Sequence, residues 1–190
     1  MAELQQQHPE ASLEVWAQDE ARLGLIPILR RVWGPRGERS WASVQPRYQW
    51  LYLFALVCPQ TGEAFFLLLP TVSAAIMSLV LALFAQQVGA GPDRHILVVL
   101  DGAGWHVAKD LKVPEGVHLA VLPPYSPEIN PAERLWPLVR EALANRWFDG
   151  LEALEDATAR RCNELSAQPE VVRAHCLPSW WPPTHPCESV

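Results

Sequence analysis

The amino-acid sequence predicts an α/β domain with a mixed five-stranded sheet flanked by helices. Its 190 residues fit one domain of ordinary size, and 49% of them are hydrophobic, which is enough for a substantial core. The apolar residues occur in short runs of strand length and in longer stretches of helix length. The first three short runs precede any long stretch, whereas the later ones alternate with helical segments. This order predicts an antiparallel meander followed by alternating strands and helices.

The strand boundaries follow from these runs and from turn residues. Residues 13–25 alternate between apolar and polar side chains, as expected of a half-buried strand. Thr61 and Gly62 mark a turn between two further runs. Strands are expected at residues 13–25, 47–59, 63–70, 96–101 and 116–123.

Helices are expected at residues 73–89, from Pro131 to about Phe148 and at residues 150–166, with a further short helix after Asp101. The first of them belongs to a stretch from Ala64 to Pro92 that has no charged residue and is long enough to span a bilayer. Pro70 splits this stretch, and the helix ends in glutamines and a glycine. We therefore expect it to pack against the sheet and not to cross a membrane.

The fourth predicted strand ends in an acidic residue. Residues 96–100 are β-branched and leucine residues without polar alternation, which is typical of a strand covered on both faces. Asp101 follows, and Gly102 and Gly104 come directly after it. A carboxylate is thereby left at the mouth of the sheet, where open α/β sheets tend to place their chemistry.

A proline-rich loop at residues 122–136 ends by starting a helix. Asn130 can cap this helix, and Pro131 suits its first position. Glu133 is then presented from the first turn. A purely structural role is the alternative, because a capping box or the helix dipole also selects an acid at this position.

The loop sequence P-P-Y-S-P-x-x-N-P-x-E-x-x-W, after a hydrophobic strand that ends in Asp101, resembles the DDE-type transposases of bacterial insertion sequences in the mariner superfamily. The pair Asp19 and Glu20 matches the first acidic motif of that family. Asp101 and Glu133 are 32 residues apart, within the family's range. The resemblance covers roughly residues 13–148. The sequence departs from the family at Gly102, where Asn is usual.

The resemblance implies a ribonuclease H-like fold whose first and fourth strands lie side by side. Asp19, Asp101 and Glu133 would converge as catalytic residues and as ligands of two Mg²⁺ ions, with Mn²⁺ as a substitute. The implied activity is metal-dependent DNA cleavage and strand transfer. Because neighbouring strand residues face opposite sides, only one of Asp19 and Glu20 can reach the site, and Asp19 is expected there. Glu20 and His106, where the family commonly has a histidine, are auxiliary candidates. A capping or exposed histidine is the alternative for His106.

The net charge of −6 is unfavourable for binding DNA phosphates, but the basic residues are clustered. Five arginines occur from residue 30 to residue 47, at Arg30, Arg31, Arg36, Arg39 and Arg47. Together with the nearby aromatic residues Trp33, Trp41 and Tyr48, they could follow a phosphate backbone and stack on bases. A solvated hairpin with ordinary surface arginines is the alternative.

The chain is expected to divide into a short N-terminal extension (1–12), the catalytic domain (13–166) and an irregular Pro/Trp-rich tail (167–190) in which Trp180 and Trp181 can dock on the domain. No signal-peptide pattern and no C-x-x-C pair is present, so a cytoplasmic location is expected.

In the family that the sequence resembles, helix-turn-helix segments precede this domain. The resemblance therefore implies that DNA ends are bound by a homodimer or by an assembly with a helix-turn-helix-bearing chain. A non-catalytic binding or dimerisation module, and another two-metal nuclease of the same fold, are the alternative functions.

Overall fold

A computed structural model describes residues 1–37 and 47–182 of the chain. In this described part, one five-stranded sheet has the order β3-β2-β1-β4-β5. Its strands are β1 (Ser12–Gly24), β2 (Trp50–Val57), β3 (Ala64–Leu69), β4 (Arg94–Leu100) and β5 (Val117–Val121). β1, β2 and β3 form an antiparallel meander, whereas β4 runs parallel to both β1 and β5. The predicted mixed sheet is therefore confirmed.

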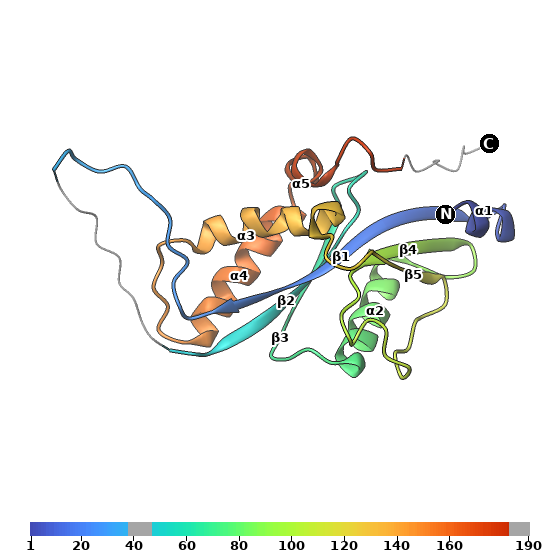
Figure 1. The fold of residues 1–190 in the computed structure, drawn as a ribbon, viewed down its shortest axis with the longest axis horizontal. Coiled ribbons are helices and arrows are strands. Elements are labelled where there is room, and N and C mark those ends of the chain that lie inside the picture. The colour runs from blue at the N-terminus through green and yellow to red at the C-terminus, as the bar shows by residue number, and fades with distance from the viewer. Residues whose placement is uncertain (38–46, 183–190) are drawn as a thin grey trace.

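Helices cover both faces of this sheet (Figure 1). α2 (Ala74–Val88) packs on one face, where Trp16 of β1 and Phe54 of β2 contribute to a buried cluster. The opposite face carries α3 (Leu135–Leu143), α4 (Leu151–Ser166) and α5 (Pro169–Cys176) over a second buried cluster. The strands β1 and β2 contribute alternate residues to the two clusters, as the pleat of a strand requires.

α2 has the ends that its sequence predicts. The Ser73 side chain accepts a hydrogen bond from the backbone N–H of Ile76, and Gly89 closes the helix in the left-handed conformation with a φ of 69°. Met77, Phe84 and other apolar residues of α2 are buried against the sheet. Across the residues described, no helix has the length and apolar character needed to cross a bilayer.

The first half of the tail was predicted wrongly as irregular. Residues Pro169–Cys176 form α5, because Val172 and Cys176 reach the core and are completely buried. Trp181 is buried after the helix, as its predicted docking requires, and Trp180 remains half exposed. At the other end of the chain, α1 (Ala2–Gln7) lies within the predicted N-terminal extension.

The turn between β2 and β3 fits closely against α5, and this contact requires a glycine. Gly62 has a φ of +82°, and a Cβ atom there would lie 1.8 Å from the carbonyl oxygen of Pro169. Gly62→Ala is therefore expected to destabilise the protein, by about 1–3 kcal/mol for the backbone conformation alone. Urea denaturation measures this loss. Gly91→Ala is the control, since a Cβ there meets nothing within 4 Å. Equal stability of the two variants would contradict the described packing of α5.

The loop after β5 contains two short 3₁₀ helices, η1 (Pro127–Ile129) and η2 (Pro131–Arg134), and η2 leads directly into α3. The helix predicted from Pro131 to Phe148 is thus shorter and begins as a 3₁₀ turn. Pro137 lies in the first turn of α3, where the missing backbone N–H removes no hydrogen bond of that helix.

Candidate active site

The parallel pairing of β1 and β4 places Asp19 and Asp101 at the same level of the sheet. The last paired residues are Ala17 and Val99, and each aspartate follows two residues later. β4 ends at Leu100, whereas β1 continues along β2. Two carboxylates from distant parts of the sequence are therefore carried to the same edge of the sheet, where the two strands separate.

The loop that leads into α3 brings the third acid to this place. Asn130 fastens the loop to β1, because its Nδ2 donates a hydrogen bond to the carbonyl oxygen of Gln18 over 2.9 Å. Its Oδ1 accepts a hydrogen bond from the backbone N–H of Ala132 over 3.1 Å, so the predicted capping role of Asn130 is confirmed. Glu133 projects from the 3₁₀ turn that Asn130 caps.

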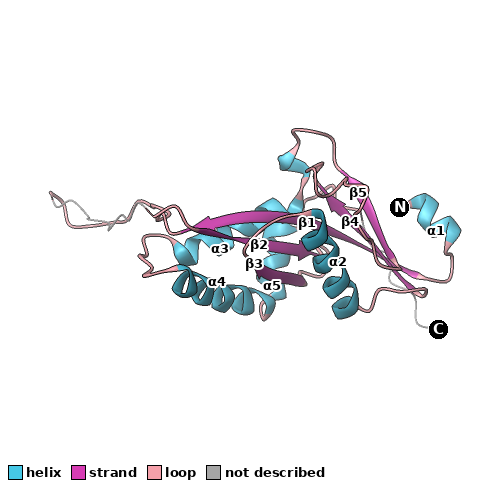
Figure 2. Cartoon of the chain, turned by 90° about the horizontal axis from the view of Figure 1, so that it is seen from below, coloured by secondary structure: helices cyan, strands magenta, loops and turns pink. Residues whose placement is uncertain are grey.

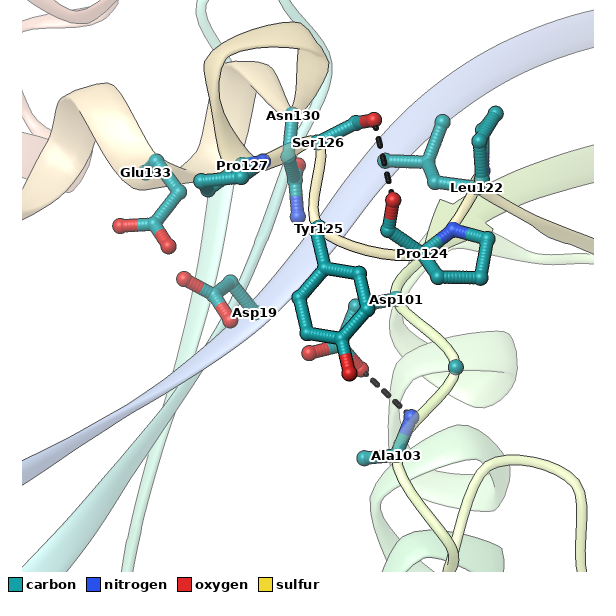
Figure 3. A pocket seen from close by; sticks show the side chains of 12 residues that line it. Asp19, Asp101, Ala103, Leu122, Pro124, Tyr125, Ser126, Pro127, Asn130 and Glu133 are labelled. Carbon is teal, nitrogen blue, oxygen red and sulfur yellow. Dashed lines mark hydrogen bonds between the residues drawn. The ribbon is translucent and has the colours of Figure 1, made fainter.

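Asp19, Asp101 and Glu133 line one pocket of about 410 Å³. Figure 3 shows the carboxylates of Asp19 and Glu133 pointing toward one another, with Asp101 on the other side of the pocket behind the ring of Tyr125. Tyr125 is fully exposed and has a positive φ of 59°, which is unusual for a bulky side chain. The pocket is thus lined by acids from a strand, a strand end and a helical turn.

Asp19 is buried, with 8% of its surface exposed, and its Oδ2 accepts a hydrogen bond from the indole Nε1 of Trp136 over 2.7 Å. The pKa of Asp19 is raised to about 7, chiefly by burial and also by the negative charges of Glu133 and Glu20, against the opposing effect of the Trp136 hydrogen bond. A negative charge at Asp19 is therefore poorly compensated by the protein itself.

Asp101 is held from the opposite side. Its Oδ1 accepts hydrogen bonds from the backbone N–H of Ala103 over 3.0 Å and from Nδ1 of His106 over 2.8 Å. The other ring nitrogen of His106 lies 2.9 Å from Oε1 of Glu20, which also accepts a bond from Nε1 of Trp105. Burial alone would lower the pKa of His106, but the hydrogen bond and charge of Glu20, together with the charge of Asp101, outweigh it and raise this pKa.

Glu20 lies on the opposite face of β1 from Asp19 and does not line the pocket.

The short helix predicted after Asp101 does not form, and turns take its place. The bond from Ala103 to the Asp101 side chain offers the backbone an alternative to a helical turn, which explains this difference.

The chemistry of the three acids suits a hard divalent cation, because carboxylate oxygens are the ligands that Mg²⁺ prefers. The poorly compensated charge of Asp19 fits the same role. Within residues 1–37 and 47–182, however, no group of three or more His, Cys, Asp or Glu side chains is arranged to hold one ion. The acids surround a common pocket but do not form the closed three-ligand cluster that the sequence led us to expect. Asp101 lies across the pocket from Asp19 and Glu133 (Figure 3).

Residues 14–155 match a family model described as "DDE superfamily endonuclease". The chain belongs to this family. It is also similar to "Uncharacterized protein y4pE/y4sA" of Sinorhizobium fredii (strain NBRC 101917 / NGR234), with 37% identity over 132 residues that make up 69% of this chain and 96% of the relative.

The fold of this DDE endonuclease recurs in solved structures. One is the "Mos1 mariner paired end complex with Mn", with a TM-score of 0.58, 17% identity and coverage of 95% of this chain and 61% of that chain. Another is a simian T-cell lymphotropic virus intasome in complex with PP2A regulatory subunit B56 gamma, with a TM-score of 0.54, 11% identity and coverage of 95% and 60%. The present chain thus spans less than two thirds of these chains. Identities this low establish the fold alone, and the predicted ribonuclease H-like architecture is confirmed.

The described parts of the predicted basic segment, residues 26–37 and 47–49, leave the sheet at the end of the molecule opposite α1, and we call them the arm (Figures 1 and 2). Arg31 and Arg36 are exposed on it. Arg30 approaches Glu141 of α3 at 3.7 Å, and Arg47 donates to the carbonyl oxygen of Asp149 over 2.9 Å. Arg39 lies outside the described residues. None of the described arm arginines lines the acidic pocket.

Two hydrogen-bond donors to the acidic residues of β1 were not predicted from the sequence. Trp136 and Trp105 donate hydrogen bonds to Asp19 and Glu20, respectively. Trp136 is the last residue of the loop motif, so its place in the motif was a usable signal. Nothing in the sequence around Trp105 indicates its partner.

Proposed function

We propose that this DDE endonuclease carries out metal-dependent DNA cleavage and strand transfer, with Asp19, Asp101 and Glu133 as its catalytic residues. The observation that supports this proposal is their common pocket, which is lined by residues from β1, the end of β4 and η2. Endonuclease chemistry is the activity of the family, and an open acidic pocket of about 410 Å³ has room for a phosphodiester group.

We propose two Mg²⁺ ions, replaceable by Mn²⁺, as the cofactor, with the same three carboxylates as protein ligands. The Mos1 structures of related fold include paired end complexes with Mn and with Mg, which supports this choice. Such ions lower the pKa of bound water and stabilise the charge on the attacking and leaving oxygens of an in-line displacement.

The residues of the chain prepare the pocket for this displacement. Trp136 fixes Oδ2 of Asp19, while His106 and Ala103 fix Oδ1 of Asp101. In the described structure Oδ2 of Asp101 accepts no hydrogen bond and is available to a ligand. In the first step, water attacks phosphorus and the bond between phosphorus and the 3′ oxygen breaks. The attacking water loses a proton to solvent, and the leaving 3′ oxygen takes a proton from solvent. The resulting 3′-hydroxyl then attacks a phosphodiester of target DNA in the same manner.

Product analysis tests this function. Plasmid DNA carrying the inverted repeats that flank the coding sequence should be cut with Mg²⁺ or Mn²⁺ to give free 3′-hydroxyl ends, and those ends should then be joined to a second plasmid. Preferential cutting of Holliday junctions or RNA–DNA hybrids would instead identify another nuclease of this fold. Absence of both cutting and Mg²⁺ binding would identify a non-catalytic binding module.

We also propose that the arm holds DNA. Arg31→Ala combined with Arg36→Ala should weaken DNA binding and reduce the slope of log K against log salt by about 1–2, because each lost phosphate contact removes about 0.9. Fluorescence anisotropy from 50 to 200 mM salt measures this slope. Arg160→Ala, on the exposed side of α4, is the control. An unchanged slope in the double variant would favour the solvated-hairpin interpretation.

The proposed assembly on DNA is a homodimer or a complex with a helix-turn-helix-bearing chain. Light scattering of the protein with and without repeat DNA distinguishes the two. A dimer on the DNA with this chain alone supports the former, whereas a DNA complex that requires the added chain supports the latter.

A further inference from the structure

A chain of hydrogen bonds leads from residues outside the pocket to Asp101. Its members are Trp105, Glu20, His106 and Asp101. Trp105 donates to Oε1 of Glu20 over 3.0 Å, and the same oxygen lies 2.9 Å from Nε2 of His106. Nδ1 of His106 lies 2.8 Å from Oδ1 of Asp101. The imidazole ring therefore bridges a carboxylate on β1 and the carboxylate that follows β4.

This bridge is shielded from water except at its Asp101 end. The side chain of His106 is completely buried, that of Glu20 is 7% exposed, and that of Asp101 is 56% exposed. Polar groups buried to this extent are costly unless they are paired, and every ring nitrogen of His106 has a partner. Since exchange with water does not compete with the inner bonds, the bridge has one defined geometry.

The orientation of the Asp101 side chain depends on hydrogen bonds from other residues. Asp101 follows the last residue of β4, and the next residue is Gly102, so no neighbouring side chain restrains it. Its own side chain is mostly exposed. The bonds from His106 and from the backbone of Ala103 both fix Oδ1, and they leave Oδ2 open.

We propose that His106 and Glu20 are positioning residues that orient Asp101 for metal binding, an inference that rests on the proposed function. Glu20 is the sequence neighbour of Asp19 but acts on Asp101, because the alternation of β1 directs it to the opposite face of the sheet. The adjacent acids of β1 thereby have separate tasks. Asp19 lines the pocket itself, and Glu20 acts through His106 on the acid of the neighbouring strand.

Binding of Mn²⁺ to the metal-free protein, followed by electron paramagnetic resonance, tests this role without relying on activity. His106→Ala should weaken Mn²⁺ binding by roughly 10–100-fold, the usual cost of losing a group that supports a metal ligand. His106→Asn should recover part of the affinity, since its amide nitrogen can take the place of Nδ1. Glu20→Gln, which keeps the acceptor oxygen and preserves the fold, should weaken binding less than His106→Ala.

In DNA cleavage the same variants should lower kcat and leave KM for DNA unchanged, because neither residue reaches the pocket. His95→Asn is the matched control, since it replaces another buried histidine, on β4 but outside the pocket. It is expected to alter stability without altering Mn²⁺ affinity.

Asp101→Asn distinguishes a failure of the positioning role from a failure of the proposed metal site. If Asp101→Asn loses Mn²⁺ binding while His106→Ala, His106→Asn and Glu20→Gln bind as the wild type does, the positioning role is wrong and the proposed function stands. If Asp101→Asn also binds Mn²⁺ normally, the metal site itself is wrongly assigned. If the His106 variants do not fold, Glu20→Gln alone decides, and wild-type affinity in that variant overturns the role.

Discussion

Replacing Asp101 with Asn, or Glu133 with Gln, is expected to abolish nearly all DNA cleavage. Each change removes one negative charge from the pocket and keeps the size of the side chain. Both residues are exposed, so stability should change little. The rate should fall by more than about 100-fold, since replacing even a group that only supports a metal ligand costs up to that factor. Cleavage of supercoiled plasmid with Mg²⁺ measures the loss.

Glu128→Gln provides the control for this experiment. Glu128 is exposed in η1 of the same loop and does not line the pocket. Its variant should cut DNA at the wild-type rate. Wild-type cleavage by Asp101→Asn and Glu133→Gln as well would show that the catalytic residues lie elsewhere.

Replacing Asp19 with Asn is expected to stabilise the metal-free protein at neutral and higher pH while removing its function. The pKa of Asp19 is raised from 3.8 to about 7 in the folded state. Between these values the folded protein binds more protons than the unfolded chain, so stability falls as the pH rises and the loss is complete above pH 7. A shift of this size corresponds to at most about 4 kcal/mol. Asparagine carries no charge and can still accept the Trp136 hydrogen bond.

Urea denaturation in EDTA at pH 4 and pH 8 measures this effect. The two proteins should be similarly stable at pH 4, and Asp19→Asn should be more stable at pH 8. Adding Mg²⁺ at pH 8 should stabilise only the wild type, because only its pocket binds the ion. Asp156→Asn, on the exposed side of α4, controls for the change in net charge. A variant that is less stable than the wild type at pH 8 would contradict the described cost of burying the Asp19 charge.

Local sequence patterns were sufficient to predict most of the sheet and three of the helices, α2, α3 and α4, although α3 is shorter than predicted. The alternation in β1 correctly placed Asp19 and Glu20 on opposite faces, and Ser73 with Gly89 marked the ends of α2. α5 escaped prediction because its sequence, PEVVRAHC, is short and mostly polar. It is held by long-range packing of Val172 and Cys176, which no local pattern reveals.

The resemblance to a known family pointed to three acids that line one pocket, but their hydrogen-bond partners could not be predicted from the sequence. The catalytic role of these acids stays a prediction. The pairing of Trp136 with Asp19, and of Trp105 with Glu20, joins residues 117 and 85 positions apart. Such contacts depend on how the loops fold over the sheet. The sequence likewise suggested a closed cluster of ligands, whereas in the described residues Asp101 lies across the pocket from the other two acids.

The two walls of this pocket are attached to the sheet in different ways. Asn130 ties the loop to the backbone of β1, and Trp136 ties α3 to Asp19, so the wall that carries Asp19 and Glu133 is fastened to the sheet at two points. The other wall follows β4 through a segment that includes Gly102 and Gly104 and has no regular secondary structure. The position of Asp101 on that wall therefore depends on the bonds from His106 and Ala103, and loss of these bonds should leave the opposite wall unchanged.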